Sequence, residues 1–467
     1  MLFSLFSFHS RLQLPPFGRD EPVPLFLYSS SCHNSNSTKC VMHFLGRQCE
    51  FQWLTFGIPY FKLNATQRSK KDEPLVESLA QPSLPFTREE HASRYRRLCQ
   101  KVREAGCEAM LVFSQESMYW LTGFDTGGFV FFQCLVVPAD GREPILLTRR
   151  PDLVQARQTS TITDIRIWWD SEEADPAQDL KGILAELGLE GKKIAIELNT
   201  HGLTGWNLWR VQNALNGWCT LVNDDHMIRR LRVIKSPAEI AYSRKAAEIL
   251  DNSLLAVIDA ARPGVLDSDL KAAYLTSILG QGADMPPNAP IFNSGNRAVY
   301  GRGVSDPRRI EKQDQVLAEY PVAYRHYNVK TEWTILFGTV SDAHRKMYDV
   351  GMETLHRMTE IARPGTTLGE IFDLYAAGLD AGGYRRARYG ATGYSVGCNF
   401  APTSMDVPPM IYSGNPTQCQ PGMTLFYHVM NGDSDTGLAM GVGHTLLITD
   451  GAPEVLTALP DDLTVIT

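Results

Sequence analysis

The sequence predicts an α+β protein made of an α/β domain over residues 83–222 and a larger unit over residues 223–467, in which a helix–helix–sheet pattern occurs twice. Two observations lead to this fold class. In the first part, short apolar runs alternate with helical patterns, which is typical of a sheet covered by helices. In the second part, the same four-residue sequence ends a helix in each half of the unit.

The α/β domain is predicted from its helix cap and its apolar runs. Thr87 and Glu90 have the spacing of a capping box, which indicates the start of a helix. A buried-strand pattern follows at 109–113, two more apolar runs stand at 130–137 and 144–148, and 193–197 is interpreted as another strand. Because these runs alternate with helical segments, an α/β arrangement is favoured.

The larger unit begins with a strong helix start. Ser236 is a good N-cap, Pro237 fits the first helical position, and Glu239 completes a capping box. Apolar periodicity then predicts two long helices, at about 237–262 and 267–280. These two helices form the first pair of the unit.

A duplication organises the larger unit. Ala-Arg-Pro-Gly stands at 261–264 and again, 101 positions later, at 362–365, and each copy closes one helix just before another capped helix. A strand-rich stretch follows each helix pair, at 290–338 and at 390–450. Four common residues can recur by chance, but the flanking pattern recurs as well. We therefore expect two similar halves with a cleft between two facing sheets.

Composition and charge exclude several classes of function. The chain has 43% hydrophobic and 21% charged residues, a net charge of −7 and no long basic run, so neither nucleic acid nor a membrane surface is an expected partner. Nine cysteines occur without a CxxC pair, which argues against a disulfide framework or a zinc site and favours a reducing cytoplasm. No apolar run approaches the length of about 20 residues that spans a membrane.

Residues 1–82 differ from the rest of the chain. They are rich in Ser, Asn, Pro and Phe, hold three of the nine cysteines and show no sustained period. The apolar start at 1–8 lacks a basic segment and a clear cleavage site, which disfavours a signal peptide. We expect an irregular extension that is disordered or that results from a start codon assigned too early.

Five segments spread over about residues 84–460 occur in an order that points to one family. They are Tyr119-Trp-Leu-Thr-Gly-Phe124, Leu231 to Glu239, Gly393-Tyr-Ser-Val-Gly397, Gln420-Pro-Gly-Met-Thr424 and His444-Thr-Leu-Leu-Ile-Thr-Asp-Gly451. The ordered set resembles the creatinase, aminopeptidase P and prolidase family, which is peptidase family M24. This resemblance implies a creatinase-type N-terminal α/β domain, a C-terminal catalytic domain with the pita-bread fold, and a homodimer.

The resemblance also implies where metal ligands would stand. The metallopeptidase branch carries two Asp, one His and two Glu, a donor set that suits Mn, Co, Zn or Fe and a bridging water. In this sequence those places hold Glu319, Lys330, Ala401, His428 and Gly443. A lysine in the middle of a dinuclear site brings its own positive charge and opposes metal binding. We expect no metal and no other cofactor.

Members of the family that work without metal offer a closer match. Creatinase hydrolyses a guanidinium-type C–N bond with Glu and His side chains, and ectoine hydrolase opens a cyclic amidine. The chain resembles ectoine hydrolase in the glutamate at the first ligand place, Glu319, and in the Gly-Tyr-Ser-Val-Gly turn, and it has the creatinase-type glutamate as Glu332. It departs from both relatives at His428 and Gly443, where they tend to keep Glu.

The residues themselves predict a polar strand face within 317–337. This segment has the pattern of two adjacent strands, and period two places four polar residues on one face of the second strand: Asn328, Lys330, Glu332 and Thr334. By itself the alternation favours the solvent-exposed face of an antiparallel sheet. Together with the resemblance, it predicts that this face lines the cleft and that Lys330 and Glu332 are neighbours there.

The predicted catalytic residues are Glu319, Lys330, Glu332, His428 and His444. Glu319 would act as a nucleophile or as a base on water, and Glu332 as a second acid/base or as the partner of a substrate cation. The two histidines lie in strand-like runs, where a core role is the alternative, and would pass a proton to the leaving nitrogen. Lys330 would replace the charge of the lost metal and stabilise an oxyanion.

Three tyrosines and one aspartate are predicted to bind substrate. Tyr320, Tyr324 and Tyr394 could contact a cationic or amidinium group through their ring faces and hydroxyls, although each is equally an ordinary core aromatic. Asp406 stands in a proline-containing loop and could hold a substrate ammonium group.

The sequence therefore predicts a metal-independent hydrolase of a C–N bond in a small amidine, cyclic amide or amino-acid derivative. One alternative is a divergent Xaa-Pro dipeptidase or aminopeptidase. Another is a non-catalytic binding protein on the same scaffold, although the long charged extensions of such relatives are not visible in the sequence. The expected assembly is a cytoplasmic homodimer that acts on a small-molecule substrate.

Overall fold

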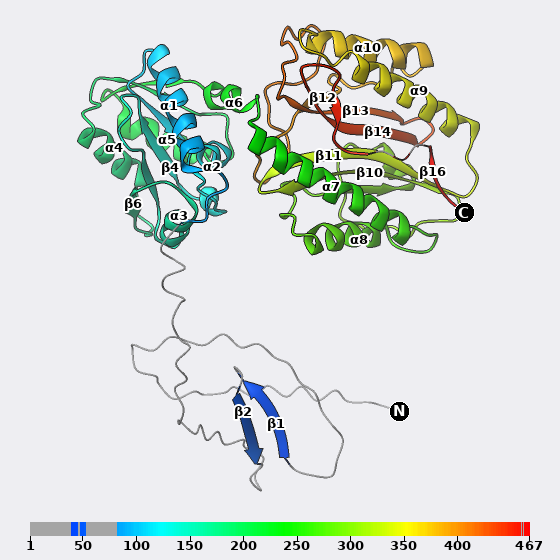
Figure 1. Ribbon diagram of the computed structural model, residues 1–467, viewed down its shortest axis with the longest axis horizontal. Coiled ribbons are helices and arrows are strands. Elements are labelled where there is room, and N and C mark those ends of the chain that lie inside the picture. Colours follow the sequence, from blue (N-terminus) through cyan, green and yellow to red (C-terminus); the bar gives the residue numbers. More distant parts are fainter. Residues whose placement is uncertain (1–38, 45–46, 53–81, 459, 461) are drawn as a thin grey trace. The chain divides into compact units, whose positions relative to one another are not determined.

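The structure is a computed structural model, and it describes residues 39–44, 47–52, 82–458, 460 and 462–467. The chain divides into two compact units, Met1–Val76 and Glu77–Thr467. In the first unit, an antiparallel hairpin is formed by β1 (Lys39–Phe44) and β2 (Arg47–Gln52) (Figure 1). Apart from this hairpin, the expectation of an irregular extension over 1–82 falls almost wholly on residues outside those described.

The second unit begins with an α/β domain built on one mixed sheet, whose described strands run in the order β6-β5-β4-β3-β7-β8. The strands are β3 (Ala109–Val112), β4 (Cys134–Pro138), β5 (Ile145–Arg149), β6 (Asp164–Trp168), β7 (Lys193–Ile196) and β8 (Thr220–Asn223). The helices are α1 (Arg88–Glu104), α2 (Gln115–Thr122), α3 (Leu153–Thr159), α4 (Pro176–Glu186), α5 (Gly205–Leu215) and α6 (Met227–Arg232). β4 is antiparallel to both of its neighbours, and the other pairs are parallel.

One segment of this domain differs from the sequence prediction. The strand expected over 130–137 begins only at Cys134, because a 3-10 turn ends at Val130 and the short connection after it, which starts with the exposed Phe131, is not paired with another strand. Segment 119–124 is the end of α2, which Gly123 closes with φ +86°, a left-handed conformation that glycine adopts without strain. Thr87 caps α1 as predicted, by accepting a hydrogen bond from a backbone amide of the first turn.

The rest of this unit contains the predicted helix–helix–sheet pattern in two copies (Figure 1). Its helices are α7 (Pro237–Ala260), α8 (Asp267–Gly280), α9 (Asp342–Glu360) and α10 (Leu368–Gly382). Its strands are β9 (Ile291–Ser294), β10 (Asp314–Tyr324), β11 (Tyr327–Phe337), β12 (Gly393–Ser395), β13 (Thr424–Asp433), β14 (Leu438–Leu447), β15 (Glu454–Val455) and β16 (Thr464–Ile466). None of the helices in the described part of the chain has the length and apolar character needed to cross a bilayer.

The two halves meet within a single sheet. Its main path runs β12-β13-β14-β11-β10-β9, and β11 pairs with β14 at Glu332 and Gly443. The sheet is therefore continuous, which corrects the expectation of two separate facing sheets. The duplication itself is visible at the helix junctions, where Gly264 and Gly365 have nearly equal φ angles of +92° and +93°.

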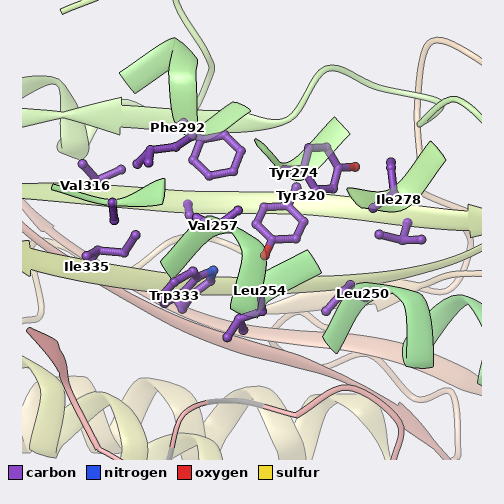
Figure 2. Close-up of a cluster of buried hydrophobic side chains, with 14 of the residues drawn as sticks. Leu250, Leu254, Val257, Tyr274, Ile278, Phe292, Val316, Tyr320, Trp333 and Ile335 are labelled. Carbon is purple, nitrogen blue, oxygen red and sulfur yellow. The ribbon is translucent and has the colours of Figure 1, made fainter. Parts of the chain in front are cut away.

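Figure 2 shows the core on the helix side of the first half. Apolar side chains from α7, α8 and β9 to β11 pack together there and are buried. They include Leu250, Leu254, Val257, Tyr274, Ile278, Phe292, Val316, Tyr320, Trp333 and Ile335. Since successive side chains of a strand point to opposite faces, the residues between these on β10 and β11 face away from the helices. That second face carries the charged side chains of the candidate site.

Candidate active site

The polar face of β10 and β11 lines a cavity of about 780 Å³. Glu319 of β10 and Glu332 of β11 are directly opposite in the strand pairing, so both carboxylates lie on the same face and line this cavity. Lys330 lies two residues from Glu332 on that face, and His428 of β13 and Tyr394 of β12 complete the polar wall. The structure thus brings together five of the residues that the sequence singled out.

Lys330 is the positive centre of the cavity wall. Its ammonium donates hydrogen bonds to Glu319 Oε1 and, at 2.6 Å, to the Tyr394 hydroxyl, and it lies 5.0 Å from the centre of the Phe426 ring. Burial disfavours the charged amine, but Glu319 and Tyr394 outweigh that effect and hold the pKa of Lys330 above its usual range. Lys330 is therefore positively charged at neutral pH.

Glu319 is held as a carboxylate. Burial opposes its ionisation, yet the Lys330 ammonium and His428 outweigh that effect and keep the pKa of Glu319 below its usual range. The side chain is 21% exposed and lines the cavity, so a bound molecule can reach it. Glu319 and Lys330 are thus a fixed pair of opposite charges at the cavity wall.

Glu332 and His428 form a second pair with a different character. His428 Nδ1 lies 3.2 Å from Glu332 Oε2, but the two atoms are not aligned as a hydrogen bond, and neither has another partner among the described residues. Burial raises the pKa of Glu332 above its usual range, although His428 acts in the opposite direction. The His428 ring stacks on Phe426 with 5.2 Å between ring centres, which holds its orientation.

The environments push the pKa values of the two opposed carboxyl groups apart. Lys330 keeps Glu319 ionised, whereas burial favours a proton on Glu332. Two carboxyl groups whose pKa values differ in this way can take different roles, one as a fixed charge and the other as a group that gains and loses a proton. The cavity can therefore combine electrostatic stabilisation with proton transfer.

Glycines of β14 make room for this arrangement. A Cβ atom on Gly441 would lie 2.3 Å from Glu332 Oε1, and a Cβ atom on Gly443 would lie 2.9 Å from His428 Cβ. Since non-bonded atoms do not approach that closely, a larger side chain at either position would displace the carboxylate or the imidazole. Gly443, which stands where the family resemblance implies a metal ligand, therefore leaves the space that the Glu332–His428 pair occupies.

The donor set does not fit a dinuclear metal centre. Within the part of the chain that the structure describes, no group of three or more His, Cys, Asp or Glu side chains is arranged to hold a metal ion. At the cavity, the Lys330 ammonium binds Glu319 and competes with any cation for the same oxygen. Ala401 and Gly443 offer no side-chain donor at two further places expected for ligands. The residues that are present favour chemistry by charged side chains.

His444 lies on the opposite face of the sheet from the cavity, which corrects its prediction as a catalytic residue. In the pairing of β13 with β14, His428 is opposite Gly443, so the next residue, His444, points the other way. Its Nε2 lies 2.9 Å from Thr359 Oγ1 of α9, and burial lowers its pKa to about 3. His444 is therefore a neutral core residue between a helix and the sheet.

Tyr320 and Tyr324 also lie on the helix side, so the prediction that they bind substrate is wrong. Both follow Glu319 at odd spacings along β10 and therefore point away from the cavity. Tyr320 stacks with Phe292 at 5.4 Å between ring centres in the core of Figure 2. Tyr324 contacts Tyr242 of α7 edge-on at 5.8 Å.

Asp406 lines a different cavity, of about 440 Å³, which corrects its prediction as a residue of the first cavity. Its carboxylate is buried in an ion pair with Arg232, and the buried Lys235 ammonium also acts on it. The loop that carries Asp406 runs between the two cavities, because Thr403 and Met405 line both. Asp406 is therefore engaged by protein cations and not free to hold a substrate ammonium group.

Residues that reach the first cavity from loops were not predicted from the sequence. Tyr300, Arg302 and Tyr389 line it from segments without a regular period. Arg302 is exposed, and its charge helps to keep Glu319 ionised. The only sequence feature at this place is the pair of glycines around Arg302, which indicates a loop but not its direction.

Comparison with known proteins identifies the family. Residues 241–450 match Metallopeptidase family M24, and residues 94–234 match the Creatinase/Prolidase N-terminal domain. The chain belongs to the M24 family. The expected family and the expected fold, a creatinase-type domain followed by a pita-bread domain, are confirmed.

Several proteins that this chain is similar to are named as hydrolases or peptidases. It is 24% identical over 402 residues to ectoine hydrolase from Halomonas elongata, a match that covers 82% of this chain and 99% of that protein. It is 31% identical over 173 residues to Xaa-Pro dipeptidase from Pyrococcus furiosus, which is 37% of this chain and 50% of that protein. These similarities support a hydrolase of the M24 family.

Solved structures with the same fold include peptidases of this family. A prolidase from Thermococcus sibiricus has a TM-score of 0.73 and 21% identity, and the match covers 80% of this chain and 99% of that one. An X-Pro aminopeptidase from Thermotoga maritima has a TM-score of 0.69 and 20% identity, with the same shares covered. At these identities the likeness establishes the fold and leaves the reaction to the residues of the site.

Proposed function

We propose that this M24 protein hydrolyses a C–N bond in a small amidine, cyclic amide or amino-acid derivative, and that it does so without a metal ion. The observation that carries the proposal is the opposed pair Glu319 and Glu332, with the Lys330 ammonium on the first and His428 beside the second. Similarity to ectoine hydrolase over nearly the whole length of that enzyme supports the same class of reaction.

The Glu332–His428 pair would move the protons of the reaction. One partner removes a proton from water as the water oxygen bonds to the carbon of the C–N group, and a proton passes to the nitrogen as the C–N bond breaks. Water supplies a hydroxyl to the carbon and a proton to the nitrogen, so the Glu332–His428 pair returns to its initial protonation state. The raised pKa of Glu332 brings its proton affinity closer to neutral pH, where such transfer is efficient.

The Lys330–Glu319 pair would supply fixed charge. The Lys330 ammonium can stabilise negative charge that develops on oxygen, and the Tyr394 hydroxyl helps to hold it in place. Glu319 can accept hydrogen bonds from the N–H groups of an amidine. Because ion pairing lowers the basicity of Glu319, this role replaces that of nucleophile or general base, which the sequence suggested.

A divergent Xaa-Pro dipeptidase is the second candidate. Prolidases and an X-Pro aminopeptidase share the fold, and an Xaa-Pro dipeptidase is 31% identical over part of the chain. Hydrolysis of such a dipeptide also breaks a C–N bond, so the same cavity could take it. The Lys330 ammonium on Glu319 argues against the metal-dependent form of that reaction.

A substrate panel with two variants tests the proposal. Purified protein is incubated with ectoine-type cyclic amidines, creatine, hydantoins, lactams and Xaa-Pro dipeptides, and the products are followed by mass spectrometry. We expect turnover of a compound from the first four groups, loss of that turnover in Glu332→Gln, and no loss in the control Glu248→Gln, an exposed glutamate of α7. Turnover of Xaa-Pro dipeptides alone, or of no compound in the panel, would count against the proposal.

A further inference from the structure

The second cavity, which Asp406 lines, contains polar residues that have no role in the proposed reaction. It measures about 440 Å³ and is lined both by residues of the α/β domain and by residues of the catalytic domain, which include Glu116, Asn199, Arg229, Arg232, Asn399 and Asp406. A volume of this size suits a small molecule. Half of the twelve lining side chains are charged or amide groups, so the ligand that this cavity suits is polar.

Two buried side chains in the wall of this cavity have polar atoms without a partner among the described residues. Arg232 is 3% exposed and uses Nη2 on Asp406, while its Nε and Nη1 atoms have no acceptor. The side-chain oxygen of Asn399, also 3% exposed, has no donor. Buried donors and acceptors in folded proteins are nearly always satisfied. These groups leave hydrogen-bonding capacity in the wall of the cavity that no described residue uses.

Two more charged groups of the lining are available to a ligand. Within the described residues, Arg229 donates to the carbonyls of Val407 and Asn199, at 3.1 and 2.5 Å, and has no carboxylate partner. Glu116 accepts a hydrogen bond from the Ser114 hydroxyl at 2.7 Å and makes no direct ion pair with a described residue, although its charge acts on Arg232. A guanidinium and a carboxylate that line one cavity without being paired suit a ligand with the opposite charges.

We propose that this cavity is a second ligand site, which binds a small zwitterion of the α-amino-acid class. The ligand carboxylate would accept hydrogen bonds from Arg229, with the positive charge of the buried Arg232 behind it, and the ligand ammonium group would donate to Glu116. Thr403 and Met405 line both cavities, so a molecule bound here contacts the wall of the catalytic cavity without entering it.

Isothermal titration calorimetry with individual free L-amino acids tests this site. We expect saturable binding of at least one amino acid, weakened about tenfold or more by Arg229→Gln and by Glu116→Gln, because each removes a charged hydrogen-bond partner. The N-acetyl derivative of that amino acid lacks the ammonium group and should bind weakly, with no further loss in Glu116→Gln. Arg230→Gln removes an exposed arginine from the same helix, α6, and should leave the affinity unchanged.

Two outcomes would overturn the second site. One is the absence of binding for every amino acid at millimolar concentration, and the other is binding that Glu332→Gln abolishes but Arg229→Gln and Glu116→Gln do not affect, which would place the ligand in the catalytic cavity. Thermal unfolding of each variant checks its fold, and Glu116→Gln keeps the test decisive should Arg229→Gln fail to fold. Since calorimetry reads binding and not turnover, its result is independent of the proposed hydrolysis.

Discussion

The two faces of the β10–β11 hairpin carry opposite chemistry on the same strands. On the helix side, Tyr320 and Trp333 are buried in the apolar core of α7 and α8 (Figure 2). On the cavity side, the neighbouring residues Glu319 and Glu332 are carboxyl groups, balanced by the Lys330 ammonium. Burial of apolar surface stabilises the fold, whereas burial of charge costs free energy that pairing only partly restores. Residues that stabilise the fold and residues that line the charged cavity are therefore direct neighbours in the sequence of each strand.

The largest expected effect is on the cavity side. Glu332→Gln should lower kcat/KM by about 100- to 10,000-fold, because an amide cannot take up or release the proton. The thermal midpoint at neutral pH should equal or exceed that of the wild type, since burial disfavours the charge that the substitution removes. Steady-state kinetics and calorimetric unfolding on the same preparation measure both quantities. A variant with full activity would remove Glu332 from the mechanism.

Substitution on the helix side should have the reverse effect. Leu250 of α7 is fully buried in the core, so Leu250→Ala should lower the free energy of unfolding by about 2–5 kcal/mol. The folded fraction should keep the kcat of the wild type. Leu255 of the same helix is 61% exposed, and Leu255→Ala should change stability by about 0.5 kcal/mol or less in the same urea titration. A large loss of kcat in folded Leu250→Ala protein would show that the two faces are not separable.

Stability at different pH values should distinguish the two carboxyl groups. Glu332 has a folded pKa above its unfolded value, so its contribution to stability is complete below about pH 4.5 and is lost as pH rises through the folded pKa. Glu319 has a folded pKa below its unfolded value, so its contribution is present above about pH 4.5 and is lost as pH falls through the folded pKa. Relative to the wild type, Glu332→Gln should therefore gain stability as pH rises and Glu319→Gln should lose it.

Urea unfolding of the wild type and both glutamine variants across the acidic and neutral range measures these differences. Opposite slopes against pH are the expected result. Equal slopes for the two variants would mean that the cavity does not separate the pKa values of its carboxyl groups.

The smallest effect is expected at His444, on the helix side of the second half. His444→Gln should leave kcat near that of the wild type, because the side chain lies on the face away from the cavity. Loss of the contact with Thr359 should cost about 1 kcal/mol of stability. Kinetics and urea unfolding check both values, and a loss of activity as large as that of Glu332→Gln would return His444 to the mechanism.

Helix starts and the duplication were predictable because their causes are local. Ser236 and Glu239 form the expected capping box, and Gly264 and Gly365 have positive φ angles in the connections that follow α7 and α9. The alternation of side chains between the two faces of a strand also predicted correctly which residues of β11 lie together. The same alternation in β10 would have placed Tyr320 and Tyr324 on the face opposite to Glu319.

The face on which a histidine lies was not predictable from one sequence. His428 and His444 stand in similar apolar runs, and only the register of β13 against β14 places the first at the cavity and the second in the core. Asp406 was misplaced for a related reason, because its partner Arg232 is 174 positions away in the chain. Register and distant partners are properties of the tertiary structure.

Metal content measured together with turnover tests the central claim most directly. Protein purified in the presence of EDTA is analysed by mass spectrometry for Mn, Fe, Co and Zn, and its activity on the substrate found in the panel is measured before and after each metal is added. We predict turnover with far less than one metal ion per chain and no change on adding EDTA or metal, because Lys330 supplies the positive charge. Turnover that requires a stoichiometric metal and disappears with EDTA would contradict the account.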